Sequence, residues 1–175
     1  MSLKDQFLSW VLNRKQNEQN RQVRAVNLTK IKTAGILWKM EDQKVFKLLV
    51  SQLKKQGISV HALCFSEQRG SVQGEAIFSP ADFSLFGKIK NPEIQQFIDN
   101  QSDILIDISL SSAIEMQYIR GLSKAAFKVG WSNAEPNFFD MTIDISSQKE
   151  PGYLVEQLLY YLAELNKQQV VNEIE

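Results

Sequence analysis

The sequence predicts a single α/β domain in three layers, with a mostly parallel sheet of five or six strands between helices. Short apolar runs alternate with segments of helical periodicity along most of the chain, as in repeated strand–helix–strand units. The run Asp103–Ile108 contains three consecutive large aliphatic residues, which indicates a strand buried on both faces. The chain has 175 residues, of which 43% are apolar and 23% charged, and this composition fits one globular domain.

Residues 2–20 predict a first helix, because apolar residues recur there at helical spacing on one face. These residues are Leu3, Phe7, Trp10 and Val11. The segment from Asn13 to Asn27 is polar and rich in glutamine and asparagine, which is typical of a helix end or a linker.

The next stretch predicts two strands joined by a helix. Residues 33–38 form a short apolar run that suits a buried strand. Asp42 is placed to cap the following helix, and Gly57 lies where a left-handed residue would end it. Residues 58–65 predict a second strand, and residues 76–78 a very short third one.

The second half of the chain continues the alternation. Asn91 and Pro92 predict a helix start, and Ser112 and Glu115 have the spacing of a capping box that opens the helix after Ile108. Residues 127–131 and 141–145 alternate as half-exposed strands near a sheet edge do. A last helix is predicted from Pro151, and its buried side is predicted to consist of Leu154, Leu158, Tyr161, Leu162 and Leu165.

These elements divide the chain into a helical extension (1–30), a Rossmann-like domain (31–168) and a C-terminal tail (169–175). In Rossmann-like sheets the strand order reverses beside the first strand, and ligands bind there at the carboxyl ends of the strands. The predicted site therefore lies where the loop after Trp38 faces the loop after Ile108.

Five polar residues around that position are candidate ligand contacts. Serine hydroxyls and the free N–H groups of a helix start can hold a phosphate or carboxylate, a lysine can neutralise it, and an aspartate can orient a hydroxyl or a metal-bound water. The alternative is structural, because serine and aspartate are also the usual residues at helix starts and a turn lysine is usually solvated. The candidates are Lys39, Asp107, Ser109, Ser111 and Ser112.

The sequence lacks the residues that disulfides, most metal sites and nucleotide-cofactor sites require. With one cysteine, Cys64, and one histidine, His61, the chain has no internal disulfide and no multi-histidine or cysteine-rich metal cluster. These two residues are three apart in one predicted strand and so point to opposite faces. We therefore expect no metal. No glycine-rich phosphate loop follows the first strand, so we expect no nucleotide cofactor, and no G-x-S-x-G motif marks a nucleophilic serine.

Charge is unevenly distributed although the net charge is zero. Residues 1–32 carry seven basic and two acidic side chains, whereas the remainder carries thirteen basic and eighteen acidic ones. The overall balance argues against a nucleic-acid partner. Neither a signal-peptide core nor a run of about 20 apolar residues occurs, so we expect a cytoplasmic protein.

Two aromatic groups lie outside the predicted strands. We expect the first helix to pack Phe7 and Trp10 against the domain or against a second copy of the chain, in a homodimer. The alternative is an anionic membrane surface, into which both rings would insert with Arg14 beside them. Phe83 and Phe86 are expected to plug the edge of the sheet, the alternative being contact with a base or a partner chain.

Six features together carry a resemblance over nearly the full chain: the basic N-terminal helix, KTAGILW, FSLFGK, SDILIDIS, SKAAFKVG and DMTIDI. This pattern resembles an uncharacterised family of small bacterial Rossmann-like proteins, which implies a fold but brings no known activity. Asp103–Ile108, the next helix and Ala126–Gly130 are also similar to the first domain of heptosyltransferase-type glycosyltransferases. Those enzymes bind their nucleotide sugar mainly in a second domain, which 175 residues cannot hold, so this similarity implies the fold and argues against that activity.

The function that we expect is a cytosolic binding module for a small anionic ligand or a protein partner, rather than an enzyme. One alternative is an enzyme that acts on a phosphorylated or nucleotide-like metabolite, using Asp107 and the serine loop. The other is a peripheral membrane adaptor that uses the basic N-terminal helix.

Overall fold

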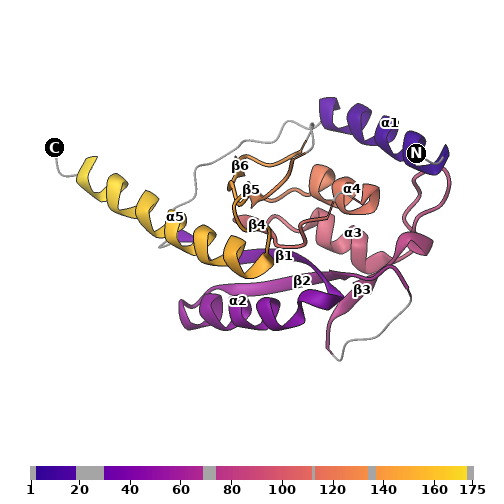
Figure 1. Ribbon diagram of the computed structural model, residues 1–175. Helices are drawn as coiled ribbons and strands as arrows, with labels where there is room; N and C mark the ends of the chain where they lie inside the picture. Colours follow the sequence, from indigo (N-terminus) through magenta and orange to yellow (C-terminus); the bar gives the residue numbers. More distant parts are fainter. Residues whose placement is uncertain (1–2, 19–29, 69–73, 112, 134–136, 173–175) are drawn as a thin grey trace.

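The computed structural model describes residues 3–18, 30–68, 74–111, 113–133 and 137–172 (Figure 1). Helices and strands alternate through these ranges, as the sequence predicts. In chain order they are α1 (Leu3–Glu18), β1 (Thr33–Lys39), the 3-10 helix η2 (Met40–Asp42), α2 (Gln43–Lys55), β2 (Ser59–Phe65), β3 (Ala76–Phe78), the 3-10 helix η3 (Pro80–Asp82), α3 (Pro92–Asp99), β4 (Ile104–Asp107), α4 (Ile114–Leu122), β5 (Phe127–Gly130), β6 (Met141–Thr142) and α5 (Pro151–Asn172).

The strands form one parallel sheet in the order β3-β2-β1-β4-β5-β6. The order reverses between β1 and β4, which lie side by side with Leu37 opposite Asp107. Every residue of β4 is buried, as the uninterrupted apolar run predicted. The Rossmann-like α/β class predicted from the sequence is therefore confirmed.

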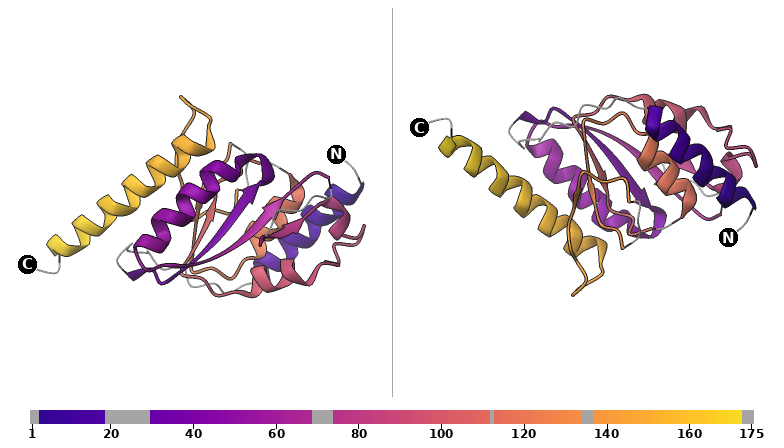
Figure 2. Two further views of the ribbon diagram at one scale, coloured as in Figure 1. Left: turned by 90° about the horizontal axis from the view of Figure 1, so that it is seen from below. Right: turned by 90° about the horizontal axis from the view of Figure 1, so that it is seen from above.

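Helices cover both faces of this sheet (Figure 2). One core lies between the sheet and the pair α2 and α5, and it includes the stacked rings of Trp38 and Phe46, whose centroids are 4.1 Å apart. The other core lies between the sheet and the pair α3 and α4. Because side chains alternate along a strand, Trp38 enters the first core and Leu37 the second. Among the described segments no helix has the length and apolar character needed to cross a membrane.

α1 lies on the outer side of α4, so it adds a further layer to that face (Figures 1 and 2). Leu8 and Leu12 point inward and are fully buried. A Cβ atom at Gly121 of α4 would collide with the Leu12 side chain, so the glycine lets the two helices approach closely. The expected packing face was wrong in part. Val11 packs against the core beside α4, but Trp10 is 55% exposed, because Leu8 and Leu12 on another side of the helix make the main contact.

Several local expectations also need correction. The N-cap position of α4 is Ala113, and the Glu115 side chain accepts a hydrogen bond from Lys4 of α1. The predicted capping box involves Ser112, which lies outside the described residues. The strand β5 is fully buried instead of half-exposed. Tyr161 is 46% exposed, since α5 passes the edge of the body before it ends (Figure 1), and the side chain of Leu165 is not among those described.

The two phenylalanines of the 79–90 segment behave differently from each other. Phe83 is buried in the core beside α3 and α4, as expected. Phe86 is 76% exposed, so it does not plug the sheet. Its backbone N–H donates to Ser84 Oγ (3.2 Å), and this bond holds it in a tight turn on the surface.

Candidate functional site

The carboxyl ends of β1 and β4 meet at the point where the strand order reverses. Since Leu37 lies opposite Asp107, residues 39–42 after β1 lie beside residues 108–111 after β4. The backbone N–H of Ile108 donates to the Leu37 carbonyl (3.0 Å), which extends the pairing into this second loop. The position predicted from the sequence is thus formed by the two loops expected.

Lys39 ends β1 and remains partly exposed at this edge. Its ammonium group forms an ion pair with Glu41, and that hydrogen bond lowers the pKa of the Glu41 carboxyl. Asp42, next in the chain, is partly buried and lies close to the Glu41 carboxylate, and both effects raise its pKa to about 6. These residues therefore provide the Lys39 cation and the Asp42 carboxyl group, whose pKa is about 6.

Asp107 and Ser109 are buried beneath the second loop. Both the N–H and the hydroxyl of Ser109 donate to Asp107 Oδ1, at 2.9 and 2.6 Å. Arg120 Nε, from α4, lies 3.1 Å from Asp107 Oδ2 in an ion pair whose geometry is not that of a hydrogen bond. The side chains of Asp107 and Arg120 are both 2% exposed. The carboxylate is thus neutralised and engaged inside the protein.

Arg120 also ties together the backbone around the loop. Its two terminal nitrogens donate to the carbonyls of Ser111 (3.2 Å) and Asn137 (3.4 Å). Its guanidinium lies 4.5 Å from the ring centroid of Phe139. Desolvation lowers the Arg120 pKa, and the charge of Asp107 opposes that shift.

The backbone of the loop is fixed in an unusual conformation. Leu110 has φ of +50°, which is a left-handed conformation that a leucine adopts only when surrounding contacts hold it there. Those contacts are local: the Ser111 N–H donates to Ser109 Oγ, and the Ala113 N–H donates to Ser111 Oγ, both at 3.2 Å. The loop is therefore shaped by its own serines before any ligand is considered.

A second buried cation lies one strand further along the sheet. Lys128 of β5 donates to the carbonyls of Arg120 (2.7 Å) and Gly121 (3.0 Å) near the C-terminus of α4. A positive charge is favoured there because helix C-termini carry partial negative charge. Lys128 thus fixes α4, and with it Arg120, against the sheet.

The candidate residues consequently divide into two groups. Asp107 and Ser109 are held inside the network, whereas Lys39 and Ser111 remain partly exposed, and Ser112 lies outside the described residues. Arg120 was not predicted as a site residue from the sequence. The available signal was its position one turn after Met116 in an apolar helix, where a charged residue needs a buried partner.

His61 lies away from this site. Its Nε2 is 3.0 Å from Ser102 Oγ, and its ring is 5.3 Å from that of Phe97 on α3. Burial lowers the His61 pKa, which favours the neutral ring. Ser102 is itself buried, so the pair has the surroundings of a structural contact.

Cys64 is buried in the core on the other side of the sheet from His61, as predicted from their spacing. Burial, with smaller contributions from nearby carboxylates, raises its pKa to about 12, so the thiol is held in its unreactive form.

Two open grooves of about 550 and 530 Å³ run beside α2 and the exposed edge of β2. They share Phe46, Val50, Lys54 and Glu75, and the second also reaches His61. Neither groove is lined by Lys39 or by the serine loop. In the described ranges no three histidine, cysteine, aspartate or glutamate side chains come together as a metal site would require.

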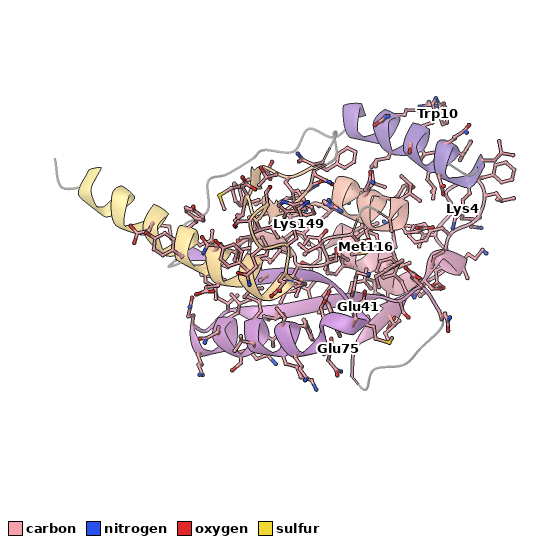
Figure 3. All side chains as sticks on the ribbon, viewed as in Figure 1. Lys4, Trp10, Glu41, Glu75, Met116 and Lys149 are labelled. Carbon is pink, nitrogen blue, oxygen red and sulfur yellow. The ribbon has the colours of Figure 1, made fainter. Side chains whose placement is uncertain are left out.

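The candidate partner contacts Phe7, Trp10 and Arg14 lie on α1. The rings of Phe7 and Trp10 are 5.6 Å apart, and the Arg14 guanidinium lies 5.8 Å from the Trp10 ring centroid. Figure 3 shows Trp10 on the outer side of α1, directed away from the body of the protein.

Comparison with known proteins identifies the family of this chain. No curated protein sequence matches it. A family model described as a family of unknown function (DUF6913) matches residues 4–165, which is nearly all of the α/β domain and α1. The chain therefore belongs to this family of unknown function, DUF6913.

Proposed function

We propose that this protein is a binding module that takes a small anionic ligand at the carboxyl ends of β1 and β4. The observation that carries the proposal is the reversal of strand order at this point, where Lys39 and Ser111 stay accessible. Asp107, Ser109 and Arg120 support the site from below by fixing the loop. The cytoplasmic location and bacterial source remain predictions.

A binding role fits the surroundings of Asp107 better than a catalytic one. A general base must have a free oxygen within reach of the substrate. Asp107 Oδ1 accepts two hydrogen bonds, and Oδ2 is buried against Arg120, so neither oxygen faces the solvent side where a substrate would lie. Asp107 is therefore assigned to holding the loop. The ligand contacts are assigned to Lys39 and to the Ser111 hydroxyl, because the Ser111 N–H and carbonyl are used within the loop.

The ion pair between Lys39 and Glu41 determines how an anion would bind. A ligand has to displace the Glu41 carboxylate from Lys39, so affinity depends on that competition. A second cation, Lys149 (labelled in Figure 3), lies 5.6 Å from the ring centroid of Trp131, which follows β5. These residues favour a ligand with one compact negative group.

Calorimetric titration with inorganic phosphate tests the proposal. We expect Lys39→Ala to weaken phosphate binding by about tenfold or more, since a hydrogen bond to a charged group is lost. Glu41→Gln removes the competing carboxylate and should strengthen binding. Lys44→Ala is the matched control, because Lys44 is an exposed lysine in the first turn of α2, and this variant should bind phosphate like the wild type.

The same titration separates this proposal from its alternatives. Equal losses in Lys39→Ala and Lys44→Ala would mean that only overall charge attracts phosphate, and the site would be wrong. NAD and ATP should not bind in the micromolar range, because no glycine-rich loop follows β1. Tight binding of either nucleotide would support the enzyme instead.

A further inference from the structure

An exposed apolar surface runs across α1 and the turn of residues 84–87. We call it the outer patch, and it consists of Leu3, Phe7, Trp10, Leu85 and Phe86. The two segments are far apart in sequence but in contact, since the rings of Phe7 and Phe86 pack edge to face with centroids 5.8 Å apart. Of the seven large hydrophobic residues that are strongly exposed in the described chain, four belong to this patch.

The outer patch is held rigidly in place rather than presented by a loose helix. On the inner side of α1, Lys4 Nζ bonds to Glu115 (2.8 Å) and to the Pro80 carbonyl (2.6 Å), while Leu8 and Leu12 are buried. The turn is held by Tyr118, whose hydroxyl donates to the Gly87 carbonyl (3.3 Å). Apolar residues thus occupy both sides of α1, and the domain covers only one of them.

Two basic residues flank the outer patch. Arg14 lies against the Trp10 ring, and Lys88 is exposed two residues after Phe86. An acidic side chain in the adjoining segment, Asp82, is turned inward and accepts from the Ser79 N–H (2.8 Å). The charge of this surface therefore complements an anionic partner.

We propose that the outer patch docks the protein onto an anionic lipid surface. Tryptophan, phenylalanine and leucine flanked by arginine and lysine are the residues that insert at the boundary between headgroups and acyl chains. The patch also projects from an outer corner of the molecule (Figures 1 and 3), as insertion into a flat surface requires. A second copy of the chain fits less well, because two facing patches would bring Arg14 and Lys88 of one copy close to the same cations of the other.

This inference does not depend on the ligand site at the carboxyl ends of β1 and β4. The outer patch shares no residue with Lys39, Ser111 or the buried network. The docking surface would therefore bring the α/β domain, with whatever ligand it holds, to the membrane.

Co-sedimentation with vesicles tests the proposal on the full chain. The wild type should pellet with vesicles of phosphatidylcholine and phosphatidylserine, pellet much less with phosphatidylcholine alone, and be released by salt. Trp10→Ala and Phe86→Ala should each weaken binding by about tenfold or more, because each removes a large inserted side chain. Leu48→Ala is the matched control, since Leu48 is an equally exposed apolar residue on α2, and it should pellet like the wild type.

Tryptophan fluorescence gives a second measurement that does not depend on pelleting. Trp10 should shift its emission to shorter wavelength when anionic vesicles are added, and Trp10→Ala should lose that shift. Circular dichroism of each variant checks that the fold is kept.

Three results would overturn the proposal. The wild type could stay in the supernatant with anionic vesicles at low salt. Trp10→Ala and Phe86→Ala could pellet as well as Leu48→Ala. Light scattering could show a dimer that Phe86→Ala dissociates, which would assign the patch to a second copy of the chain.

Discussion

Arg120 is the side chain on which the carboxyl end of β4 depends most. It neutralises Asp107 and holds the carbonyl of Ser111, and both charged groups are removed from water. Removing one partner of such a pair leaves a buried charge without compensation, which usually costs about 3–5 kcal/mol. We expect Arg120→Met to lower the free energy of unfolding by about that amount in urea denaturation.

The double variant Asp107→Asn with Arg120→Met supplies the control for this prediction. It removes both charges, so it should lose clearly less stability than Arg120→Met alone. Equal losses in the two variants would show that Arg120 acts through packing rather than through its charge.

Asp42 makes the stability of the protein depend on pH. Its pKa is about 6 in the folded protein against an ordinary value of 3.8, because burial and Glu41 disfavour the charged form. The folded state thus binds more protons between these values, so this group's contribution to stability falls as the pH rises from about 4 to about 6. Asp42→Asn should be more stable than the wild type at neutral pH, with the difference shrinking towards pH 4.

Urea denaturation of both proteins across that pH range measures the effect. Comparing the two at each pH cancels the titration of the other groups. A difference that stays constant with pH would contradict the raised pKa.

The helix α1 shows why sequence periodicity alone chose the wrong face. Leu3, Phe7 and Trp10 share one side of the helix at helical spacing, but Leu8 and Leu12 lie on another side. The large rings of Phe7 and Trp10 favoured the prediction that the first side is buried. The buried face of α1 is determined by α4, because Gly121 of α4 leaves room for Leu12. The sequence of α1 alone does not show where this space lies.

This assignment predicts unequal effects of two substitutions in α1. Leu12→Ala should lower the free energy of unfolding by about 2–5 kcal/mol, because it opens a cavity between α1 and α4. Trp10→Ala should cost less than about 1 kcal/mol, since the ring is largely exposed. Urea denaturation measures both, and a larger loss for Trp10→Ala would restore the original assignment.

Other elements were predictable to the extent that local chemistry determines them. Asn91 caps α3 by accepting from the Glu93 N–H, and Gly57 has φ of +77° after α2, as expected. Asp42 occupies the N-cap position of α2 but its side chain makes no capping bond. Strand β6 has only two residues, because beyond Thr142 the chain leaves the sheet.

For the molecule as a whole, the alternation of strands and helices was enough to predict the parallel sheet and the central place of β4. The position of the candidate site followed from the same argument, because adjacent parallel strands end at one edge. The roles of its residues did not follow, since Asp107 could be recognised as buried support only once α4 brought Arg120 to it. The direction of the last two strands was likewise undetermined by the sequence, and both are parallel.

The most direct test of the binding-module account is an NMR titration of the isotope-labelled protein with inorganic phosphate. The account predicts that backbone amide shifts concentrate at residues 39–42 and 109–111, and that Lys39→Ala abolishes them. The two grooves beside α2, which both include Lys54 and Glu75, serve as an internal comparison. Amide shifts concentrated along these grooves, or no shifts at the carboxyl ends of β1 and β4, would contradict the account.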